Sequence, residues 1–287
     1  MNSVRTQLFQ ELSMETTAGD ASRFLEAKSL MPRGVSVNIA FIGRETFEER
    51  LAAIKTLRAC GVSPRPIISA RRLISAEVLR GFLSDAVKDD AIDGVFLVGG
   101  DPSTPQGPFA SAMDVINGRY LDALGIKTVG IAGYPEGHPR IRSEVLWHYL
   151  RLKVDALLAK GFTVEVTTQL SFDIEAVIRW IERVRSMGIN VPIRIGVPSP
   201  STLLGIMHFA GQCRVGTSMQ LLQHYGWQIT SLLGKIGPER FLTVLLQTME
   251  QRDLGDVRLH IFPLGEIGKA MHWFQEYENR HLTRLVE

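Results

Sequence analysis

The stretch Thr128-Val129-Gly130-Ile131-Ala132-Gly133-Tyr134-Pro135-Glu136-Gly137-His138-Pro139 decides the fold of this 287-residue chain. Its first four residues form an apolar run that predicts a buried strand, and a helical pattern begins at about residue 143. Between them, two glycines and two prolines lie within seven residues and prevent regular structure. We therefore expect a rigid loop at the carboxyl end of a strand.

This loop carries a tyrosine, a carboxylate and an imidazole, on Tyr134, Glu136 and His138. In α/β proteins, ligands bind at the carboxyl ends of parallel strands. The three side chains could therefore contact a ligand, or they could only pack within a well-formed turn. Their spacing fits both interpretations.

The same strand-then-helix pattern repeats along the whole chain. Further apolar runs predict strands at residues 12–16, 35–39, 66–70, 94–98, 164–168, 192–197 and 257–262. Helices begin after the capping residues Thr46, Ser75 and Asp173. Eight such units in about 250 residues favour a closed (β/α)8 TIM barrel over an open sheet. Residues 201–255 are too long for one crossover and predict two or three extra helices before the last strand. No linker is visible, so we expect one domain over residues 1–287.

The composition argues against several classes of protein. The hydrophobic fraction of 45% and the charged fraction of 22% are ordinary for a soluble globular protein. A net charge of +2 without a basic stripe does not indicate nucleic-acid binding. No run approaches the roughly 18 apolar residues of a membrane span. Cys60 and Cys213 lie far apart and the histidines are scattered, so we expect no metal site and a cytoplasmic location.

In a barrel, the carboxyl ends of the strands bring candidate functional residues together at one face. Besides the loop residues above, these are Glu15, Asn38, Ser69, Arg71, Arg72, Gly99, Gly100, Asp101, Thr168, Gln169, Gly196 and Pro198.

Two of these candidates carry carboxylates. Burial of Glu15 in an apolar strand would favour its neutral form, a usable general acid, but Glu15 could equally pair with an arginine. The glycines before Asp101 would let the backbone approach a ligand closely, so that the Asp101 carboxylate could contact it. Alternatively, these residues could form a plain turn.

The other polar candidates also have two interpretations. Gln169 could make paired hydrogen bonds to a planar heterocycle or cap the next helix. Arg71 and Arg72 could bind a diphosphate or a polycarboxylate, or they could be ordinary surface arginines. Together the candidates suit a planar polar ligand without identifying a reaction.

Four motifs resemble those of the methylenetetrahydrofolate reductase family, in order along nearly the whole chain. The loop of residues 131–139 is very close to that family's loop. Residues 168–173, Thr-Gln-Leu-Ser-Phe-Asp, are similar to its Thr-Gln-(aromatic-rich)-Asp motif. Residues 12–15 resemble its opening strand, and residues 98–102 resemble its Arg-Gly-Asp-x-Pro turn.

The resemblance implies a (β/α)8 barrel that holds FAD at its mouth and acts on a folate in one-carbon metabolism and methionine biosynthesis. Glu15 would be the general acid that opens the imidazolidine ring, and Asp101 would lie near the pterin and the flavin. Gln169 would hydrogen-bond the pterin, and Phe209 would stack on the folate. The residues that would contact FAD are Asn38, Ser69, Gly100, Ala132, Gly133, Tyr134, His138 and Lys153. FAD would take a hydride from NAD(P)H and pass it to the folate.

The chain departs from the family pattern near the flavin. Residues 16–19 replace an aromatic-proline segment, and Gly99 replaces the Arg of the turn. Ile39 and Ile67 stand where the family usually has Tyr and His, and Gly205 aligns with a Gln.

These residues lead to three hypotheses. The first is flavin-dependent interconversion of 5,10-methylenetetrahydrofolate and 5-methyltetrahydrofolate, including oxidation of the latter. The second is a flavin-free reductase of the same folate that uses NAD(P)H directly. The third is a folate-binding barrel without catalysis. Barrels of this kind often associate through their outer helices, so a homo-oligomer is a further expectation.

Overall fold

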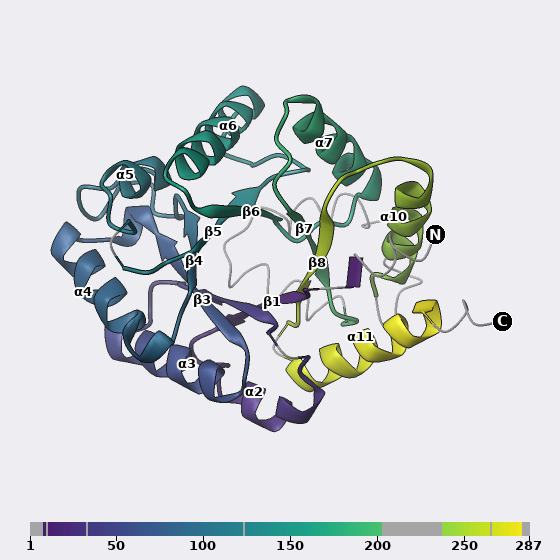
Figure 1. Cartoon of the computed structure of the whole chain (residues 1–287), viewed down its shortest axis with the longest axis horizontal. Coiled ribbons are helices and arrows are strands. Elements are labelled where there is room, and N and C mark those ends of the chain that lie inside the picture. Colours follow the sequence, from purple (N-terminus) through teal and green to yellow (C-terminus); the bar gives the residue numbers. More distant parts are fainter. Residues whose placement is uncertain are drawn as a thin grey trace.

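A computed structural model describes residues 8–282 apart from residues 10, 33, 123, 203–236 and 265. In the described residues, parallel strands in sequence order form a closed barrel (Figure 1). The barrel closes where β1 pairs with β8, with Ser13 opposite His260. The strands are β1 (Ser13–Thr17), β2 (Ser36–Ala40), β3 (Ser63–Ser69), β4 (Gly94–Val98), β5 (Thr128–Gly133), β6 (Thr163–Thr168), β7 (Ile193–Pro198) and β8 (Val257–Phe262).

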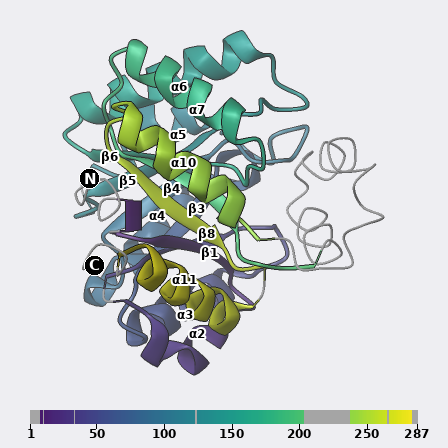
Figure 2. The same cartoon turned by 90° about the vertical axis from the view of Figure 1, so that its right-hand side faces the viewer.

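Helices surround this barrel, and α10 and α11 lie beside β8 at its closing edge (Figures 1 and 2). None of the helices described has the length and apolar character needed to cross a membrane. The helices are α2 (Arg23–Glu26), α3 (Phe47–Ala59), α4 (Ala76–Ala86), α5 (Ala112–Asn117), α6 (Ser143–Ala159), α7 (Ile174–Ser186), α10 (Glu239–Gln251) and α11 (Ile267–Leu282), with 3-10 turns η1 (Lys28–Leu30), η2 (Ala70–Arg72) and η3 (Lys88–Asp90).

The predicted barrel is confirmed, and so are the predicted helix caps. Thr46 forms a capping box with Glu49, and the side chain of Asp173 accepts a hydrogen bond from the Ala176 amide. The α10 helix lies before the last strand as predicted, and the rest of the predicted insertion, residues 203–236, lies outside the described residues. That one domain accounts for residues 1–287 stays a prediction.

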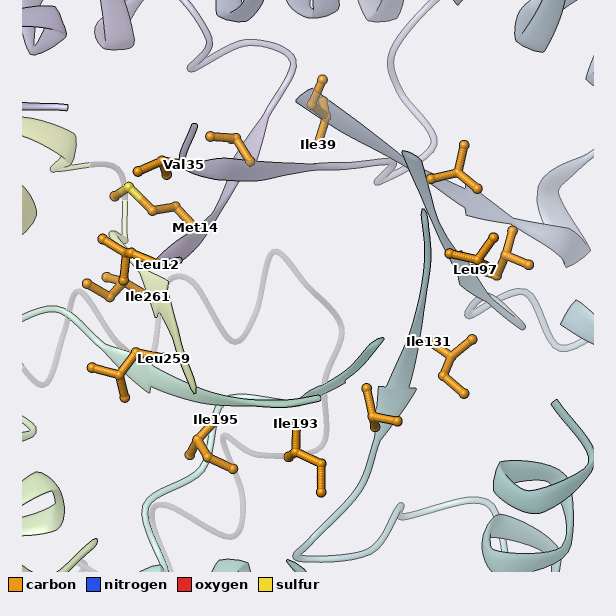
Figure 3. Close-up of a cluster of buried hydrophobic side chains, with 14 of the residues drawn as sticks. Leu12, Met14, Val35, Ile39, Leu97, Ile131, Ile193, Ile195, Leu259 and Ile261 are labelled. Atoms are coloured by element: carbon orange, nitrogen blue, oxygen red, sulfur yellow. The ribbon is translucent and has the colours of Figure 1, made fainter. Parts of the chain in front are cut away.

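The main hydrophobic core lies between the strands and the helices. Alternate residues of a strand point to opposite faces, so one set packs outward and the other points into the barrel. Figure 3 shows Ile39, Leu97, Ile131 and Ile195 on the outer side of the ring of strands, and all four belong to the core. The inward-pointing set lines the interior of the barrel.

Near the starts of the strands, the inward-pointing set forms a buried layer of charges. The Glu165 carboxylate of β6 accepts from Arg65 Nη1 of β3 at 2.5 Å and from Arg194 Nε of β7 at 2.8 Å. Arg194 and Arg258 also contact Glu11. Burial alone would raise the pKa of Glu165, but the two arginines on its oxygens bring this pKa down to about 2. With this end of the barrel filled by ion pairs, ligand chemistry is left to the opposite end.

Candidate functional site

A cavity of about 830 Å³ opens at the carboxyl ends of the strands. We call it the barrel-mouth cavity, and its volume lies within the range of roughly 300–1,000 Å³ usual for small-molecule and cofactor sites. Most of the predicted site residues line it: Glu15, Ser69, Gly100, Asp101, Ala132, Gly133, Tyr134, His138, Lys153 and Gln169. Asn38 is buried and is not among the described lining residues, while Phe209 lies outside the described residues.

One wall of the barrel-mouth cavity is apolar. Ala40, Ile67, Phe96 and Ala132 come from four consecutive strands and form a small cluster separate from the main core. Ile67 therefore lies where a ligand would rest, as its place in the family pattern implies. The same inference for Ile39 is wrong, because Ile39 packs outward against helices and cannot contact a ligand in the barrel.

Glu15 projects into this cavity from β1, with 18% of its side chain exposed. Its Oε2 lies 3.8 Å from Nε2 of His260 on β8. Among the described residues, no arginine lies within ion-pair distance of Glu15. The described structure therefore does not contain the alternative pair of Glu15 with an arginine. The Glu15 carboxyl group thus faces the cavity on one side and His260 on the other.

The loop after β5 presents two neutral hydrogen-bonding side chains. The rings of Tyr134 and His138 meet edge to face with 5.4 Å between their centroids. Burial raises the pKa of Tyr134 to about 12, and burial together with Arg140 lowers the pKa of His138. Nδ1 of His138 accepts from the Arg140 amide at 3.2 Å, so the proton of the neutral ring sits on Nε2. Both side chains can therefore donate to a ligand near neutral pH.

Glu136, in the same loop, has a structural role. Its Oε1 accepts from the Phe172 amide at 2.9 Å and from the Asp173 amide at 3.3 Å. This carboxylate therefore ties the loop after β5 to the loop after β6, which carries Gln169.

Gln169 lines the cavity, and its backbone amide donates to Gly133 O at 3.0 Å. The next helix is capped by Asp173, so the capping alternative for Gln169 is wrong. Its side-chain amide is available to a ligand.

Arg71 and Arg72 make the contacts of a structural pair. Arg72 donates two hydrogen bonds to the Asp101 carboxylate, from Nε to Oδ1 at 2.9 Å and from Nη2 to Oδ2 at 2.8 Å. Arg71 donates to the carbonyls of Pro102, Ser103 and Ala110 and so holds the loop after β4. Both arginines thus bind groups of the protein itself, while Arg71 also lines the barrel-mouth cavity, and the diphosphate interpretation of the pair stays a prediction.

Two of the glycines predicted at the site, Gly100 and Gly133, leave no room for a side chain. Gly100 has a φ of +97°, and a β-carbon there would collide with Ser69 Oγ. At Gly133 a β-carbon would lie 2.8 Å from the Trp180 ring, so this glycine lets α7 pack closely on β5.

Lys153 projects from α6 to the barrel-mouth cavity. Burial lowers the pKa of its ammonium group to about 8. Among the described residues no carboxylate forms an ion pair with it, so Lys153 is a cation that suits an anionic part of a ligand. No group of three or more His, Cys, Asp or Glu side chains in the part of the chain described could hold a metal ion.

The histidine opposite Glu15 was not among the predicted site residues. Side chains along β8 alternate between the inner and the outer face of the barrel. Arg258 and Phe262 point inward, so His260, which lies midway between them, points inward too. That pattern is present in the sequence, but only closure of the barrel brings His260 next to β1.

The fold and the cavity define a (β/α)8 barrel with a ligand-sized cavity at the carboxyl ends of the strands. The model of the family "Methylenetetrahydrofolate reductase" matches residues 27–226, and the chain belongs to this family. A methylenetetrahydrofolate reductase (NADH) of Arabidopsis thaliana is 30% identical in an alignment of 159 residues that covers 48% of this chain and 25% of that protein. A probable methylenetetrahydrofolate reductase (NADH) of Oryza sativa subsp. japonica is 32% identical over 65% of this chain and 36% of its own length.

The chain thus spans only 25% and 36% of the length of these two plant relatives. The 5,10-methylenetetrahydrofolate reductase of Pectobacterium carotovorum subsp. carotovorum is 28% identical over 65% of this chain and 60% of that protein.

Two solved structures share the fold at low sequence identity. A Clostridium thermocellum protein described as binding two copies of 5-methyl-5,6,7,8-tetrahydrofolic acid has a TM-score of 0.62 and 11% identity, over 97% of this chain and 98% of that one. Dihydropteroate synthase from Thermus thermophilus has a TM-score of 0.51 and 12% identity, over 95% and 94% of the two chains. At such identities these likenesses concern the fold alone.

Proposed function

We propose that this protein interconverts 5,10-methylenetetrahydrofolate and 5-methyltetrahydrofolate with the help of FAD. The observation that carries the proposal is that Glu15, Gln169 and Lys153 line one cavity in a member of the methylenetetrahydrofolate reductase family. The acid can protonate the leaving nitrogen of the folate, and the amide can hydrogen-bond the pterin. The cation can bind the anionic part of the cofactor.

The chemistry of the cavity fits FAD. Its apolar wall of Ala40, Ile67, Phe96 and Ala132 suits a flat ring system, and Lys153 suits a diphosphate. Tyr134 and His138 can donate hydrogen bonds to it as neutral groups. When bound, FAD supplies a carrier for a hydride, with NAD(P)H as the proposed source for folate reduction.

The side chains of the protein bind the folate and manage its protons. Glu15 delivers a proton to the leaving nitrogen of the imidazolidine ring and so opens that ring. Gln169 holds the pterin by paired amide hydrogen bonds, and Phe209 stacks on the folate. Asp101 meets the ligand as a carboxylate whose charge Arg72 already balances.

The visible spectrum of the purified protein tests this proposal, recorded before and after anaerobic addition of 5-methyltetrahydrofolate. We expect a yellow protein that bleaches, because flavin and folate then exchange a hydride. A yellow protein that keeps its colour would contradict the folate assignment. A protein that stays colourless with added FAD would favour a flavin-free NAD(P)H reductase or a non-catalytic folate-binding barrel.

The variant Glu15→Gln tests the proton donor. We expect folate turnover to fall by about 10²–10⁴-fold, the usual contribution of a general acid, while folate still binds. Steady-state rates and calorimetric binding measure the two effects. Glu144→Gln, on the exposed first turn of α6, is the matched control. Full turnover by Glu15→Gln would remove Glu15 as the acid.

A cytoplasmic location and assembly into homo-oligomers through the outer helices are further parts of this proposal. Sedimentation of the purified protein tests the second of these.

A further inference from the structure

His260 is a fully buried histidine inside the barrel that the proposed mechanism does not yet use. It lies on β8 directly across from Ser13 of β1, and its Nδ1 is 2.8 Å from Ser13 Oγ. Its Nε2 has no hydrogen-bond partner among the described residues and lies 3.8 Å from Glu15 Oε2. A buried imidazole nitrogen without a partner is costly, so its position beside a carboxyl group of the site calls for an explanation.

The contacts of Ser13 fix the tautomer of this imidazole. Ser13 Oγ lies 3.3 Å from the Leu259 carbonyl as well as 2.8 Å from His260 Nδ1. A hydroxyl has one proton, so both contacts are hydrogen bonds only if Ser13 donates to Leu259 O and accepts from Nδ1–H. A neutral imidazole carries a single N–H, which leaves Nε2 as an acceptor facing Glu15.

The surroundings keep the ring neutral. Burial lowers the pKa of His260, and Arg194 of β7 lowers it further, whereas Glu15 of β1 and Glu165 of β6 raise it. Arg258, on the same strand as His260, lies 3.8 Å from Glu165 and is a third cation of this layer beside Arg65 and Arg194. Burial has the largest effect on the pKa of His260, so the ring stays neutral and Nε2 carries no proton near neutral pH.

We propose that His260 is a positioning residue whose unprotonated Nε2 accepts the hydrogen bond of the protonated Glu15 carboxyl and so keeps Glu15 ready to donate a proton. The inference rests on the proposed function, in which Glu15 is the proton donor. The distance of 3.8 Å is longer than a hydrogen bond, and the inference requires a rotation of the partly exposed Glu15 side chain that shortens it. Such contacts often tighten only when the substrate is bound.

The arrangement also acts after the proton has left. A lone pair of Nε2 then faces the Glu15 carboxylate, and this repulsion favours uptake of a new proton from the barrel-mouth cavity. His260 has no exposed surface and does not itself exchange protons with solvent.

The test is the hydrogen bonding of Glu15, read from the infrared carbonyl band of its protonated carboxyl in the full-length protein without folate. Glu15→Gln identifies the band. In His260→Phe no acceptor remains, and in Ser13→Ala the N–H can move to Nε2, which then no longer accepts. We expect the band to move to higher frequency in both variants, because the carboxyl has lost the acceptor of its hydrogen bond. Folate turnover should fall with it, with kcat at neutral pH reduced about tenfold, the size of one lost hydrogen bond, and KM for folate unchanged.

The control is Ile261→Val, which loosens the outer face of the same strand without touching Glu15. A Glu15 carboxyl band that stays unchanged in Ser13→Ala and in a folded His260→Phe would overturn the inference. If His260→Phe does not fold, Ser13→Ala alone decides. The infrared measurement needs no turnover, so a wild-type protein without folate activity would remove the proposed function and leave the contact between His260 and Glu15 measurable.

Discussion

Lys153 is a lysine whose charge depends on pH within the range in which enzymes are assayed. Burial lowers its pKa to about 8, and a bound diphosphate would favour the charged form and raise this pKa again. Protein above pH 8 must therefore take up a proton to bind the anion. We expect the affinity for FAD to be constant below about pH 7 and to fall by up to about tenfold per pH unit above about pH 8. Fluorescence titration of FAD across this range measures the change.

Replacement of Lys153 tests the same residue without a change of pH. In Lys153→Met we expect the Kd for FAD to rise by about 10–100-fold, the value of one charge-assisted hydrogen bond, and its dependence on pH to disappear. Lys160→Met is the matched control, because Lys160 pairs with Asp122 at the end of the same helix and does not line the cavity. Equal losses in the two variants would argue against a contact between Lys153 and the cofactor.

Single residues show what a sequence can reveal about a site. Tyr134 and Gln169 were predicted at the mouth of the barrel, and both line its cavity, because the end of a strand can be read from local pattern alone. The partners of Arg71 and Arg72 could not be predicted in this way. Their contacts lie about thirty residues further on, in a loop whose path follows no periodic pattern.

At the scale of elements, Glu136 joins the loops after β5 and β6. In Glu136→Ala the amides of Phe172 and Asp173 lose this acceptor, and we expect a loss of about 1–3 kcal/mol of unfolding free energy. The β6 loop carries Gln169, so folate affinity should fall with it. Urea unfolding measures the stability, and hydrogen exchange at the two amides locates the change.

Glu136→Gln is the control for this connection, because the amide oxygen of glutamine can still accept both hydrogen bonds. Stability close to that of the unchanged protein is the expected result for this variant. A loss as large as that of Glu136→Ala would mean that the charge, rather than the two hydrogen bonds, holds the loops together.

The elements themselves were predicted well because their signals are local. The capping box at Thr46 and the apolar runs of the strands depend on neighbours within a few residues. Which face of a strand points inward requires one further step. Ile39 was predicted near the flavin, but alternation along β2 puts Asn38 and Ala40 on the inner face and Ile39 among the helices.

At the scale of the whole molecule, closure of the barrel creates contacts that no local pattern contains. Ser13 hydrogen-bonds His260, which lies 247 residues further along the sequence, and Arg65 hydrogen-bonds Glu165, which lies 100 residues further along. Eight repeated units predict that a barrel closes, but not which inward-pointing residues then face each other. The buried charge layer and the contact of His260 with Glu15 were missed for this reason.

The charge layer should also determine how the whole fold responds to acid. Glu165 has a folded-state pKa of about 2 against an ordinary value of 4.5, so its stabilising effect is complete above about pH 5 and is lost as the pH falls towards 2. In Glu165→Gln, Arg65 and Arg194 lose their buried partner, and we expect a loss of about 3–5 kcal/mol near pH 7.

The comparison variant is Glu182→Gln, which breaks the exposed pair between Glu182 and Arg252 and should cost no more than about 1 kcal/mol. Urea unfolding at about pH 7, 5 and 3 measures both variants. The difference between the wild type and Glu165→Gln should shrink at the lowest pH, since the wild type then begins to lose the same charge. A difference that is small near pH 7, or one that grows as the pH falls, would mean that the arginines of the barrel interior are balanced by groups other than Glu165.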